Sequence, residues 1–393
     1  MVSLQQTQSL DLDYLESLGF AWHTDEDETP YVSDQLVVLS EEEAEAYYEA
    51  GNLLYEMFIE AGEYVVENNL FHEIGIPFNL VDLIKESWEN DVHWHIYGRF
   101  DLAGGIDSRD IKLLEFNADT PTALFETAIV QWAILKQNDL EEESQFNTLY
   151  DSLVDNFKRT VTLEESVDNF DDLYDGWKFL FTSIKDNIEE ENTVRLLQHI
   201  AHEAGFDTEF AYIDDIEFSD EEGIVYEGEE YELWFKLIPW EDIALEEPDL
   251  AMLLKNIIQN QKAIIFNPAY TLMFQSKGIL KILWDLYPNH PLLLESSFEP
   301  LEDQRQVVKP VFGREGESVT ILDGDGSIVA EASGAYENHK MLYQAYTELP
   351  TDQSGTSYQA GLFYVYESCA VGFRKGGLIL DNMSKFIGHI VRS

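Results

Sequence analysis

Four polar side chains in the segment 95–126 have the types and spacing of a site for a metal ion and a phosphate. Arg99 and Asp101 are two residues apart. Glu115 and Asn117 repeat that spacing further along the chain. Because side chains alternate across a strand, the members of each pair point to one face. Carboxylate and amide oxygens are suitable ligands for Mg²⁺, and a guanidinium group is suitable for binding phosphate. The alternative is an exposed hairpin rich in charge. The spacing alone does not decide between these two interpretations.

The residues between the two pairs predict how they are brought together. Gly104 and Gly105, followed by Asp107, lie between two runs of strand-forming residues, which is typical of a hairpin. This turn would place both pairs on one surface.

The segment after the hairpin, 120–137, predicts a helix with Pro121 in its first turn and an apolar stripe. The first N–H groups of that helix, with the hydroxyls of Thr120 and Thr122, would hold an anionic group. The alternative is that Thr120 only caps the helix.

Other local patterns predict a mixed α/β fold. Residues 1–39 indicate an irregular lead-in, and Ser40 with Glu43 forms a capping box that opens a helix to about residue 68. A shorter helix capped by Asn79 follows. Strand, helix and strand patterns between 177 and 218 predict a parallel α/β unit.

Two lysines fall in predicted elements of the C-terminal half of the chain, and the pattern around Lys309 suits phosphate binding. Lys277 falls in a predicted helix, and Lys309 falls in the first of two strands joined by a glycine-containing loop. The segment is neither a Walker motif nor a dinucleotide fingerprint. A strand lysine before a mobile loop would still contact nucleotide phosphates.

Composition excludes several classes of function. The chain has 393 residues, with 23 Lys and Arg against 77 Asp and Glu, for a net charge of −54. Nucleic acid is therefore a poor partner, and no apolar run is long enough to cross a bilayer. Without a visible secretory signal, a cytoplasmic location is expected. The acidic residues are spread along the whole chain. This favours a role in keeping the protein solvated in a salt-rich cytoplasm over a role in attracting a polycationic substrate.

Several separated blocks together resemble the synthetase domain of the glutathionylspermidine synthase family. These blocks are GRFDLAGGIDSRDIKLLEFNADTPTALFE, VVKPVFGREGE, YQAYTELP and AVGFRKGGLILDNMSKFIGHIV. The resemblance implies an α+β and α/β chain with an ATP-grasp fold, a helix-rich N-terminal portion and an inserted α/β (pre-ATP-grasp-like) portion. It implies one multi-lobed unit over 1–393: a helical shell with the hairpin at 1–136, a substrate-side lobe at 137–260, and ATP-grasp lobes at 261–393.

The resemblance also implies an activity. Family members use ATP and Mg²⁺ to join a peptide carboxylate to an amine through an acyl phosphate, so a glutathione-like peptide and a polyamine are one implied substrate pair. The single cysteine, Cys369, does not match the amidase module of bifunctional members. We expect it to be a packed residue rather than a nucleophile.

Residue roles follow from matching motif positions. The implied metal ligands are Asp101, Glu115 and Asn117, and the implied catalytic arginines are Arg99 and Arg374. The implied ATP contacts are Arg99, Lys277, Lys309, Gln344, Ala345 and Tyr346, and the implied substrate contacts are Thr120, Thr122, Glu190 and Glu191.

Two departures from the family pattern concern the substrate side. Pro121 separates the two threonines, and Leu237 stands near where a polar contact is expected. A nucleotide-binding protein that lacks ligase turnover and acts through a partner is the alternative function. An acidic, cation-buffering protein is a third.

Overall fold

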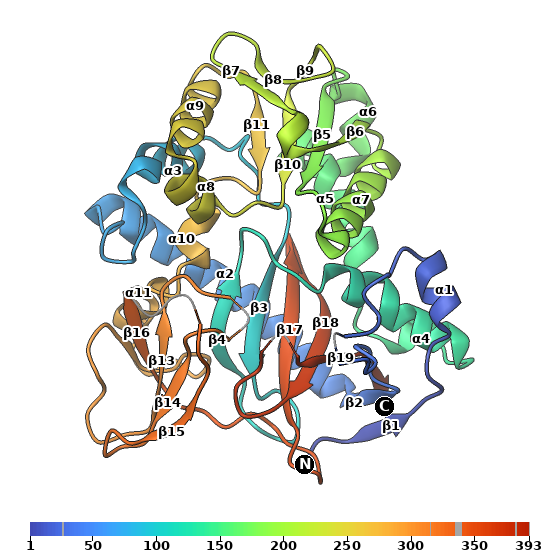
Figure 1. Cartoon of the computed structure of the whole chain (residues 1–393), viewed down its shortest axis with the longest axis vertical. Helices are drawn as coiled ribbons and strands as arrows, with labels where there is room; N and C mark the ends of the chain where they lie inside the picture. The colour runs from blue at the N-terminus through green and yellow to red at the C-terminus, as the bar shows by residue number, and fades with distance from the viewer. Residues whose placement is uncertain (26, 315, 335–339, 382, 393) are drawn as a thin grey trace.

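The computed structural model describes residues 1–25, 27–314, 316–334, 340–381 and 383–392. Its lower part holds two antiparallel sheets that lie side by side, and its upper part holds a parallel sheet with helices beside it (Figure 1). Two three-stranded sheets complete the described strands. The mixed α/β fold predicted from the sequence is confirmed.

The first large sheet carries the predicted hairpin. Its strand order is β19-β18-β17-β3-β4, with every neighbouring pair antiparallel. In the hairpin Arg99 lies opposite Asn117, and Asp101 lies opposite Glu115. The hairpin prediction is therefore correct. The bounds are β3 Gly98–Ala103, β4 Lys112–Asn117, β17 Ser357–Val365, β18 Glu367–Gly376 and β19 Lys385–Ile387.

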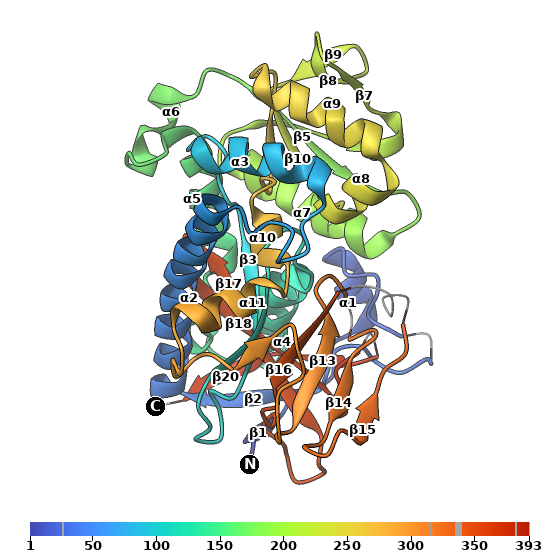
Figure 2. The ribbon, with the colours of Figure 1, turned by 90° about the vertical axis from the view of Figure 1, so that its left-hand side faces the viewer.

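Helix α2 (Glu41–Asn68) runs along one face of this sheet (Figure 2). Ser40 and Glu43 form the predicted capping box at its start. The helix approaches the sheet closely at Gly51, where an added Cβ would lie 2.6 Å from the side chain of Leu362. A glycine is therefore required at this crossing.

The second antiparallel sheet has the order β12-β16-β13-β14-β15 and faces the hairpin. Lys309 lies in β13, and β13 pairs with β14 beyond the glycine-containing loop, as predicted for this pair of strands. Gln344 lies in β16. The DGDGS segment forms the turn between β14 and β15. The bounds are β12 Ser296–Ser297, β13 Gln306–Pro310, β14 Thr320–Leu322, β15 Ile328–Glu331 and β16 Met341–Ala345.

The upper sheet is parallel throughout, with the order β11-β10-β5-β6. Helix α7 (Ile188–Glu203) connects β5 (Lys178–Ser183) to β6 (Asp207–Tyr212), so the predicted α/β unit is confirmed. The other two strands are β10 (Leu233–Lys236) and β11 (Ile264–Phe266). Strand β11 of this sheet lies beyond residue 260. The lobe boundaries at residues 136 and 260 stay a prediction.

The prediction of an irregular lead-in over residues 1–39 is wrong. This segment contains β1 (Leu4–Gln6), α1 (Leu12–Ser17) and β2 (Gln35–Ser40). Strand β2 pairs in parallel with β20 (His389–Arg392). The strand was missed because its hydrogen-bond partner lies at the other end of the sequence.

The predicted helix at 120–137 begins later than expected. Ala123 has φ +62°, and the helix begins at Leu124 with a π-helical turn, η2 (Glu126–Val130), that continues into α4 (Gln131–Gln137). Thr120, which lies in a bend, and Pro121 therefore come before the helix. Thr120 does not cap this helix, and its predicted contact with a substrate stays a prediction.

Two other helix predictions are also wrong in detail. Asn79 does not cap α3 (Val81–Glu89), because its Nδ2 donates to the Ala244 carbonyl at 2.9 Å. Lys277 lies between α10 (Thr271–Gln275) and α11 (Ile279–Leu286) rather than inside a helix. Its backbone N–H donates to the carbonyl of Val311, which interrupts the helical hydrogen bonds.

The remaining described elements connect these sheets. They are η1 Phe78–Leu80, η3 Glu142–Ser144, α5 Leu149–Thr162, η4 Val167–Asn169, α6 Phe170–Leu173, η5 Ile213–Asp215, β7 Glu217–Ser219, β8 Gly223–Tyr226, β9 Glu229–Tyr231, α8 Trp240–Glu246 and α9 Pro248–Gln259.

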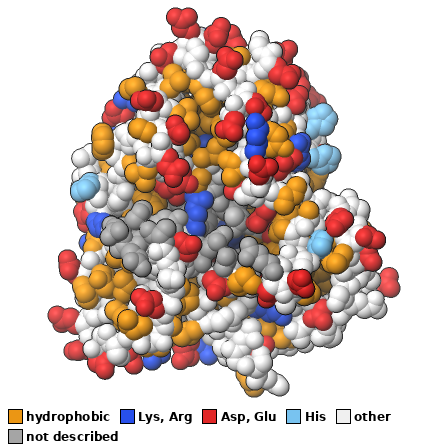
Figure 3. All heavy atoms as spheres, in the orientation of Figure 1, with side chains coloured by type: hydrophobic (Ala, Val, Ile, Leu, Met, Phe, Trp, Pro, Cys, Tyr) orange, Lys and Arg blue, Asp and Glu red, His pale blue; other side chains and the backbone are white. Residues whose placement is uncertain are grey.

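Acidic side chains are scattered over the face shown in Figure 3 and do not gather in one patch. Within the described ranges, no helix is both long and apolar enough to span a membrane. Cys369 is buried, and burial raises the pKa of its thiol, which agrees with a packing role.

Candidate functional site

A cavity of 310 Å³ lies between the two antiparallel sheets. One wall is the hairpin face of β3 and β4, and the opposite wall is formed by β13 and β16. Most side chains named from the sequence line it, although they come from distant segments. The predicted site residues in its lining are Arg99, Asp101, Glu115, Asn117, Thr120, Thr122, Glu190, Lys277, Lys309, Gln344, Tyr346 and Arg374.

The hairpin face presents two carboxylates and an amide to this cavity. Asp101 is 5% exposed and binds Arg99 with both oxygens, at 2.6 Å to Nε and 3.1 Å to Nη2. Asn117 Nδ2 lies 3.5 Å from Glu115 Oε1. No cluster of three or more His, Cys, Asp or Glu side chains suited to a metal occurs in the part of the chain that the structure describes. The two carboxylates and the amide oxygen of Asp101, Glu115 and Asn117 form a set of oxygen ligands, which fits the chemistry of Mg²⁺.

Two lysines set the charge around Glu115. Lys277 Nζ lies 3.2 Å from Glu115 Oε2. Burial would raise the pKa of Glu115, but the charges of Lys277 and Lys309 lower it to about 2. Burial also lowers the pKa of Lys309 to about 8, against the opposing charge of Glu115. The cavity therefore holds an ionised carboxylate beside a lysine that loses its proton readily.

Lys309 also links the two walls. Its Nζ donates to the Leu114 carbonyl at 2.7 Å and to Gln344 Oε1 at 2.8 Å. Gln344 Nε2 in turn donates to the Leu113 carbonyl at 3.3 Å. Ala345 does not line the cavity, and its N–H donates to the carbonyl of Glu295.

Two arginines lie at the end of the cavity near the start of η2. Arg99 Nη1 donates to the carbonyl of Thr122 at 2.6 Å and to its hydroxyl at 3.1 Å. Arg374 donates to the carbonyl of Asp381. Gly361 packs against the stem of Arg99, since an added Cβ would lie 3.0 Å from Arg99 Cδ. The backbone around Arg99 thus fixes both ends of its side chain.

The predicted acidic pair on α7 is divided by the helix. Glu190 lines the cavity, and burial raises the pKa of its carboxyl against the nearby charge of Arg314. Glu191 instead binds Arg195 at 2.8 Å and accepts a hydrogen bond from the Tyr212 hydroxyl at 2.9 Å. Of this pair, Glu190 therefore lines the cavity and Glu191 does not.

Arg314 is a cavity residue that the sequence patterns did not identify. It lies in the loop after β13, where its Nη2 binds Glu241 at 3.1 Å and lies 3.5 Å from the Thr120 hydroxyl. Beside this pair, burial and the charge of Glu241 raise the pKa of Asp242 to about 6. The glycine-containing loop was recognised, but its arginine was not given a role.

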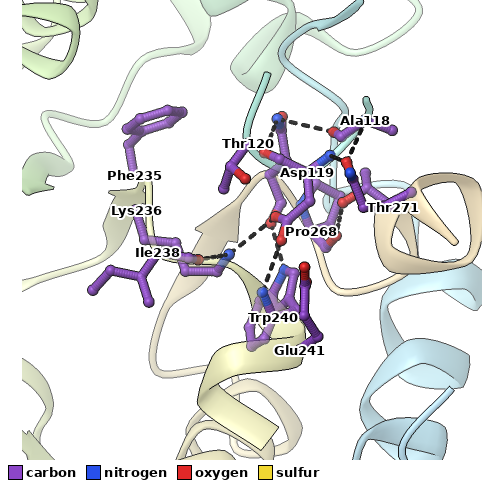
Figure 4. A network of polar contacts seen from close by, with 12 residues as sticks. Ala118, Asp119, Thr120, Phe235, Lys236, Ile238, Trp240, Glu241, Pro268 and Thr271 are labelled. Atoms are coloured by element: carbon purple, nitrogen blue, oxygen red, sulfur yellow. Dashed lines mark hydrogen bonds and ion pairs between the residues drawn. The ribbon is translucent and has the colours of Figure 1, made fainter. Parts of the chain in front are cut away.

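A buried polar network supports the segment between the hairpin and Thr120 (Figure 4). Asp119 accepts from Lys236 Nζ at 3.1 Å and from the N–H of Trp240 at 2.8 Å. Gln275 Oε1 accepts the N–H groups of Ala118 and Asp119. The sequence signal for this network is Lys236, which stands alone in the apolar run LWFKLIPW and therefore needs a buried acidic partner.

Leu237 does not line the cavity. It is 6% exposed and packs in the hydrophobic core with residues of α7 and β5. The polar substrate contact expected near this position is thus replaced by an apolar packing contact.

The fold, with a parallel α/β unit beside two antiparallel sheets, is shared with a solved structure of another protein. A solved structure described as a "glutathione synthetase like-effector (GSS30) from Globodera pallida" matches with a TM-score of 0.58 over 98% of each chain. Its sequence identity to this chain is 9%, so this likeness concerns the fold alone.

The chain belongs to the glutathionylspermidine synthase family. The family described as "Glutathionylspermidine synthase preATP-grasp" matches residues 3–392. The family resemblance found in the separate sequence blocks is confirmed.

Three curated relatives match this chain over most of its length. A Haemophilus influenzae protein named "Putative acid--amine ligase" is 30% identical and covers 84% of this chain and 81% of its own length. The Escherichia coli "Bifunctional glutathionylspermidine synthetase/amidase" is 25% identical and covers 79% of this chain and 52% of its own. The "Trypanothione synthetase" of Crithidia fasciculata is 25% identical, and the match covers 78% of this chain and 48% of the relative's own length. This chain therefore spans about half the length of the last two.

Proposed function

We propose that this protein is an ATP-dependent ligase that joins a small carboxylic acid to an amine. The observation that carries the proposal is the cavity in which Asp101, Glu115 and Asn117 face Lys277 and Lys309. The ligase names of the curated relatives support it. A glutathione-like peptide and a polyamine are the substrate classes that we propose first.

The two walls have separate roles in this proposal. Lys309, Gln344 and Tyr346 line the side of the second sheet and bind the nucleotide. Asp101, Glu115 and Asn117 hold Mg²⁺, which neutralises phosphate charge when bound. Glu115 is ionised at neutral pH because its pKa is about 2, so it is ready to act as a ligand.

The proposed reaction has two steps. An oxygen of the substrate carboxylate attacks the γ-phosphorus of ATP and forms an acyl phosphate, with ADP as the leaving group. The amine nitrogen then attacks the acyl carbon, loses a proton and expels phosphate. Arg99 and Arg374 stabilise the negative charge of the transferring phosphoryl group and of the tetrahedral state, an electrostatic role that is effective in a water-poor cavity.

Substrate selection is assigned to the part of the cavity around Thr120, Thr122 and Glu190. Thr120 and Thr122 lie beside the two arginines Arg314 and Arg99, where a carboxylate would be held. Glu190, which faces the same cavity, would attract an ammonium group.

The test is release of ADP from Mg-ATP in the presence of panels of peptides and amines. We expect ADP to appear only with a matching pair, together with an amide product detected by mass spectrometry. Binding of ADP and Mg²⁺ without turnover across broad panels would instead favour a nucleotide-binding protein that works through a partner. Absence of both binding and turnover would reject the ligase proposal.

A further inference from the structure

Gln275 is a buried glutamine beside the proposed metal face, and no sequence pattern indicated a role for it. It is the last residue of α10, is 8% exposed, and lines the main cavity together with Asn117. A polar side chain that is buried to this extent needs hydrogen-bond partners for its donor and for its acceptor. The amide group of Gln275 has partners at both ends.

The oxygen of this amide holds the backbone that leaves the hairpin. Gln275 Oε1 accepts the N–H of Ala118 at 2.9 Å and the N–H of Asp119 at 3.2 Å. These two residues follow directly after Asn117, the last residue of β4. Two N–H donors at one end of the amide require an oxygen there, so the surroundings determine which way the Gln275 amide points.

The nitrogen of the same amide therefore faces Asn117. Gln275 Nε2 donates to Asn117 Oδ1 at 3.4 Å. Asn117 in turn directs its Nδ2 toward Glu115 Oε1, at 3.5 Å. An amide oxygen has two lone pairs, so Asn117 Oδ1 can accept from Gln275 and still bind a cation. Gln275 is thus joined to the side chain of one proposed metal ligand and to the backbone next to it.

A second amide holds the carbonyl groups of the same backbone segment. Asn267 Nδ2 donates to the carbonyl of Ala118 at 3.2 Å and to the carbonyl of Asp119 at 2.9 Å. Both N–H groups and both carbonyl groups of these residues are therefore paired with buried amides. The Asp119 side chain is held as well, by its ion pair with Lys236 (Figure 4). The backbone to which Gln275 is bound is thus fixed.

We propose that Gln275 is a positioning residue that holds the Asn117 side chain in place for Mg²⁺. Its own oxygen is occupied by two N–H groups, so it acts through Asn117 and is not itself a ligand. Mg²⁺ requires near-ideal octahedral geometry, whereas the larger Ca²⁺ accepts flexible geometry, so a fixed amide ligand favours Mg²⁺. This inference rests on the proposed function, because it assumes that Asn117 is a ligand of Mg²⁺.

The test measures ADP affinity of the full chain by calorimetric titration without metal, with Mg²⁺ and with Ca²⁺. Gln275→Met keeps the length of the side chain but removes the amide. In this variant we expect the increase in ADP affinity on adding Mg²⁺ to fall about tenfold. The increase on adding Ca²⁺ should fall less, because Ca²⁺ tolerates movable ligands. ADP affinity without metal should change little.

A double-mutant cycle tests whether Gln275 acts through Asn117. Asn117→Ala removes the amide ligand but leaves the carboxylates of Asp101 and Glu115, so part of the Mg²⁺ effect should remain. Adding Gln275→Met to this variant should cause no further loss of the Mg²⁺ effect, because the two residues act as one unit. Two independent losses that multiply would overturn the route through Asn117.

Gln131→Met is the matched control. Gln131 is also a buried glutamine, with 0% exposure, and its Nε2 donates to the Val371 carbonyl at 3.3 Å. It is not part of the cavity lining. Both variants should lower the Tm, but Gln131→Met should leave the Mg²⁺ effect unchanged. An equal fall of the Mg²⁺ effect in both variants would assign Gln275 to general stability instead.

The remaining outcomes separate this inference from the proposed function. If Gln275→Met does not fold, Gln275→Asn replaces it, since the shorter amide no longer reaches both partners. An unchanged Mg²⁺ effect in the folded variant would overturn the positioning role. An unmodified protein that binds ADP without any effect of Mg²⁺ would overturn the metal face, and one that does not bind ADP would overturn the proposed function itself.

Discussion

Lys236 Nζ lies 3.1 Å from Asp119 Oδ1, and neither side chain is exposed to solvent. Burial lowers the pKa of Lys236 and raises the pKa of Asp119, so each charge depends on the other. Lys236 ends a strand of the parallel sheet, and Asp119 follows the hairpin. The pair therefore joins the upper lobe to the wall of the cavity.

Removing one partner of this pair should destabilise the protein strongly. In Lys236→Met we expect the free energy of unfolding to fall by about 3–5 kcal/mol, because Asp119 is left as an unpaired buried charge. Adding Asp119→Asn should recover part of the loss. Denaturant unfolding measures this, with Lys178→Met as the control, since its pair with Glu229 is exposed to solvent and contributes little to stability. Equal losses in the two single variants would contradict the prediction.

The lowered pKa of Lys309 predicts a pH dependence of nucleotide binding. With a pKa of about 8, the side chain is an ammonium below that pH and neutral above it. We therefore expect affinity for Mg-ADP to fall as the pH rises from about 7 to about 9. Lys309→Arg should flatten this dependence, because arginine keeps its charge.

The control for this pH dependence is Lys281→Arg, which changes a lysine that binds Asp285 within α11. It should retain the slope of the unmodified protein in calorimetric titrations. If Lys309→Arg also retains the pH dependence of Mg-ADP affinity, a group other than Lys309 causes that dependence.

Glu115→Gln tests the metal face. Glu115 is ionised at neutral pH, and glutamine keeps its shape but loses the charge. We expect the increase in ADP affinity on adding Mg²⁺ to drop by about tenfold or more. The control is Glu302→Gln, which changes an exposed carboxylate outside the cavity. An unchanged Mg²⁺ effect in Glu115→Gln would remove this residue from the ligand set.

Gly361→Ala tests the placement of Arg99 without altering any polar group. The new Cβ would lie 3.0 Å from Arg99 Cδ, so the side chain must shift by a few tenths of an ångström. Because small misplacements of a catalytic group are costly, we expect kcat to fall about tenfold or more with little change in Tm. Gly377→Ala is the control, since its Cβ meets nothing nearer than 3.7 Å. Equal activity of both variants would show that Arg99 tolerates the shift.

The features that the sequence predicted correctly are those encoded by neighbouring residues. The capping box at Ser40, the hairpin turn at Gly104 and the strand–helix–strand unit each depend on local spacing. The face shared by Asp101 and Glu115 follows from strand alternation in the same way. Local rules were therefore sufficient for the hairpin half of the cavity.

The features that were missed depend on contacts between distant segments. Asp119 and Lys236 are 117 positions apart, and nothing near either residue specifies the other. The helix after Thr120 was placed too early because Arg99 binds the Thr122 carbonyl and Ala123 takes a positive φ. The buried contact of Trp22 was overlooked for the same reason, since its Nε1 donates to Glu126, 104 positions further along the chain.

The sheet order has a consequence for synthesis of the protein on the ribosome. Strand β3 of the hairpin pairs with β17, which ends at Val365, and β17 pairs with β18. During most of translation the edge of β3 therefore has no strand to pair with. Unpaired strand edges promote aggregation. The nascent chain is therefore expected to depend on chaperone protection until its final strands emerge, and a ribosome stalled before β17 would carry no assembled cavity.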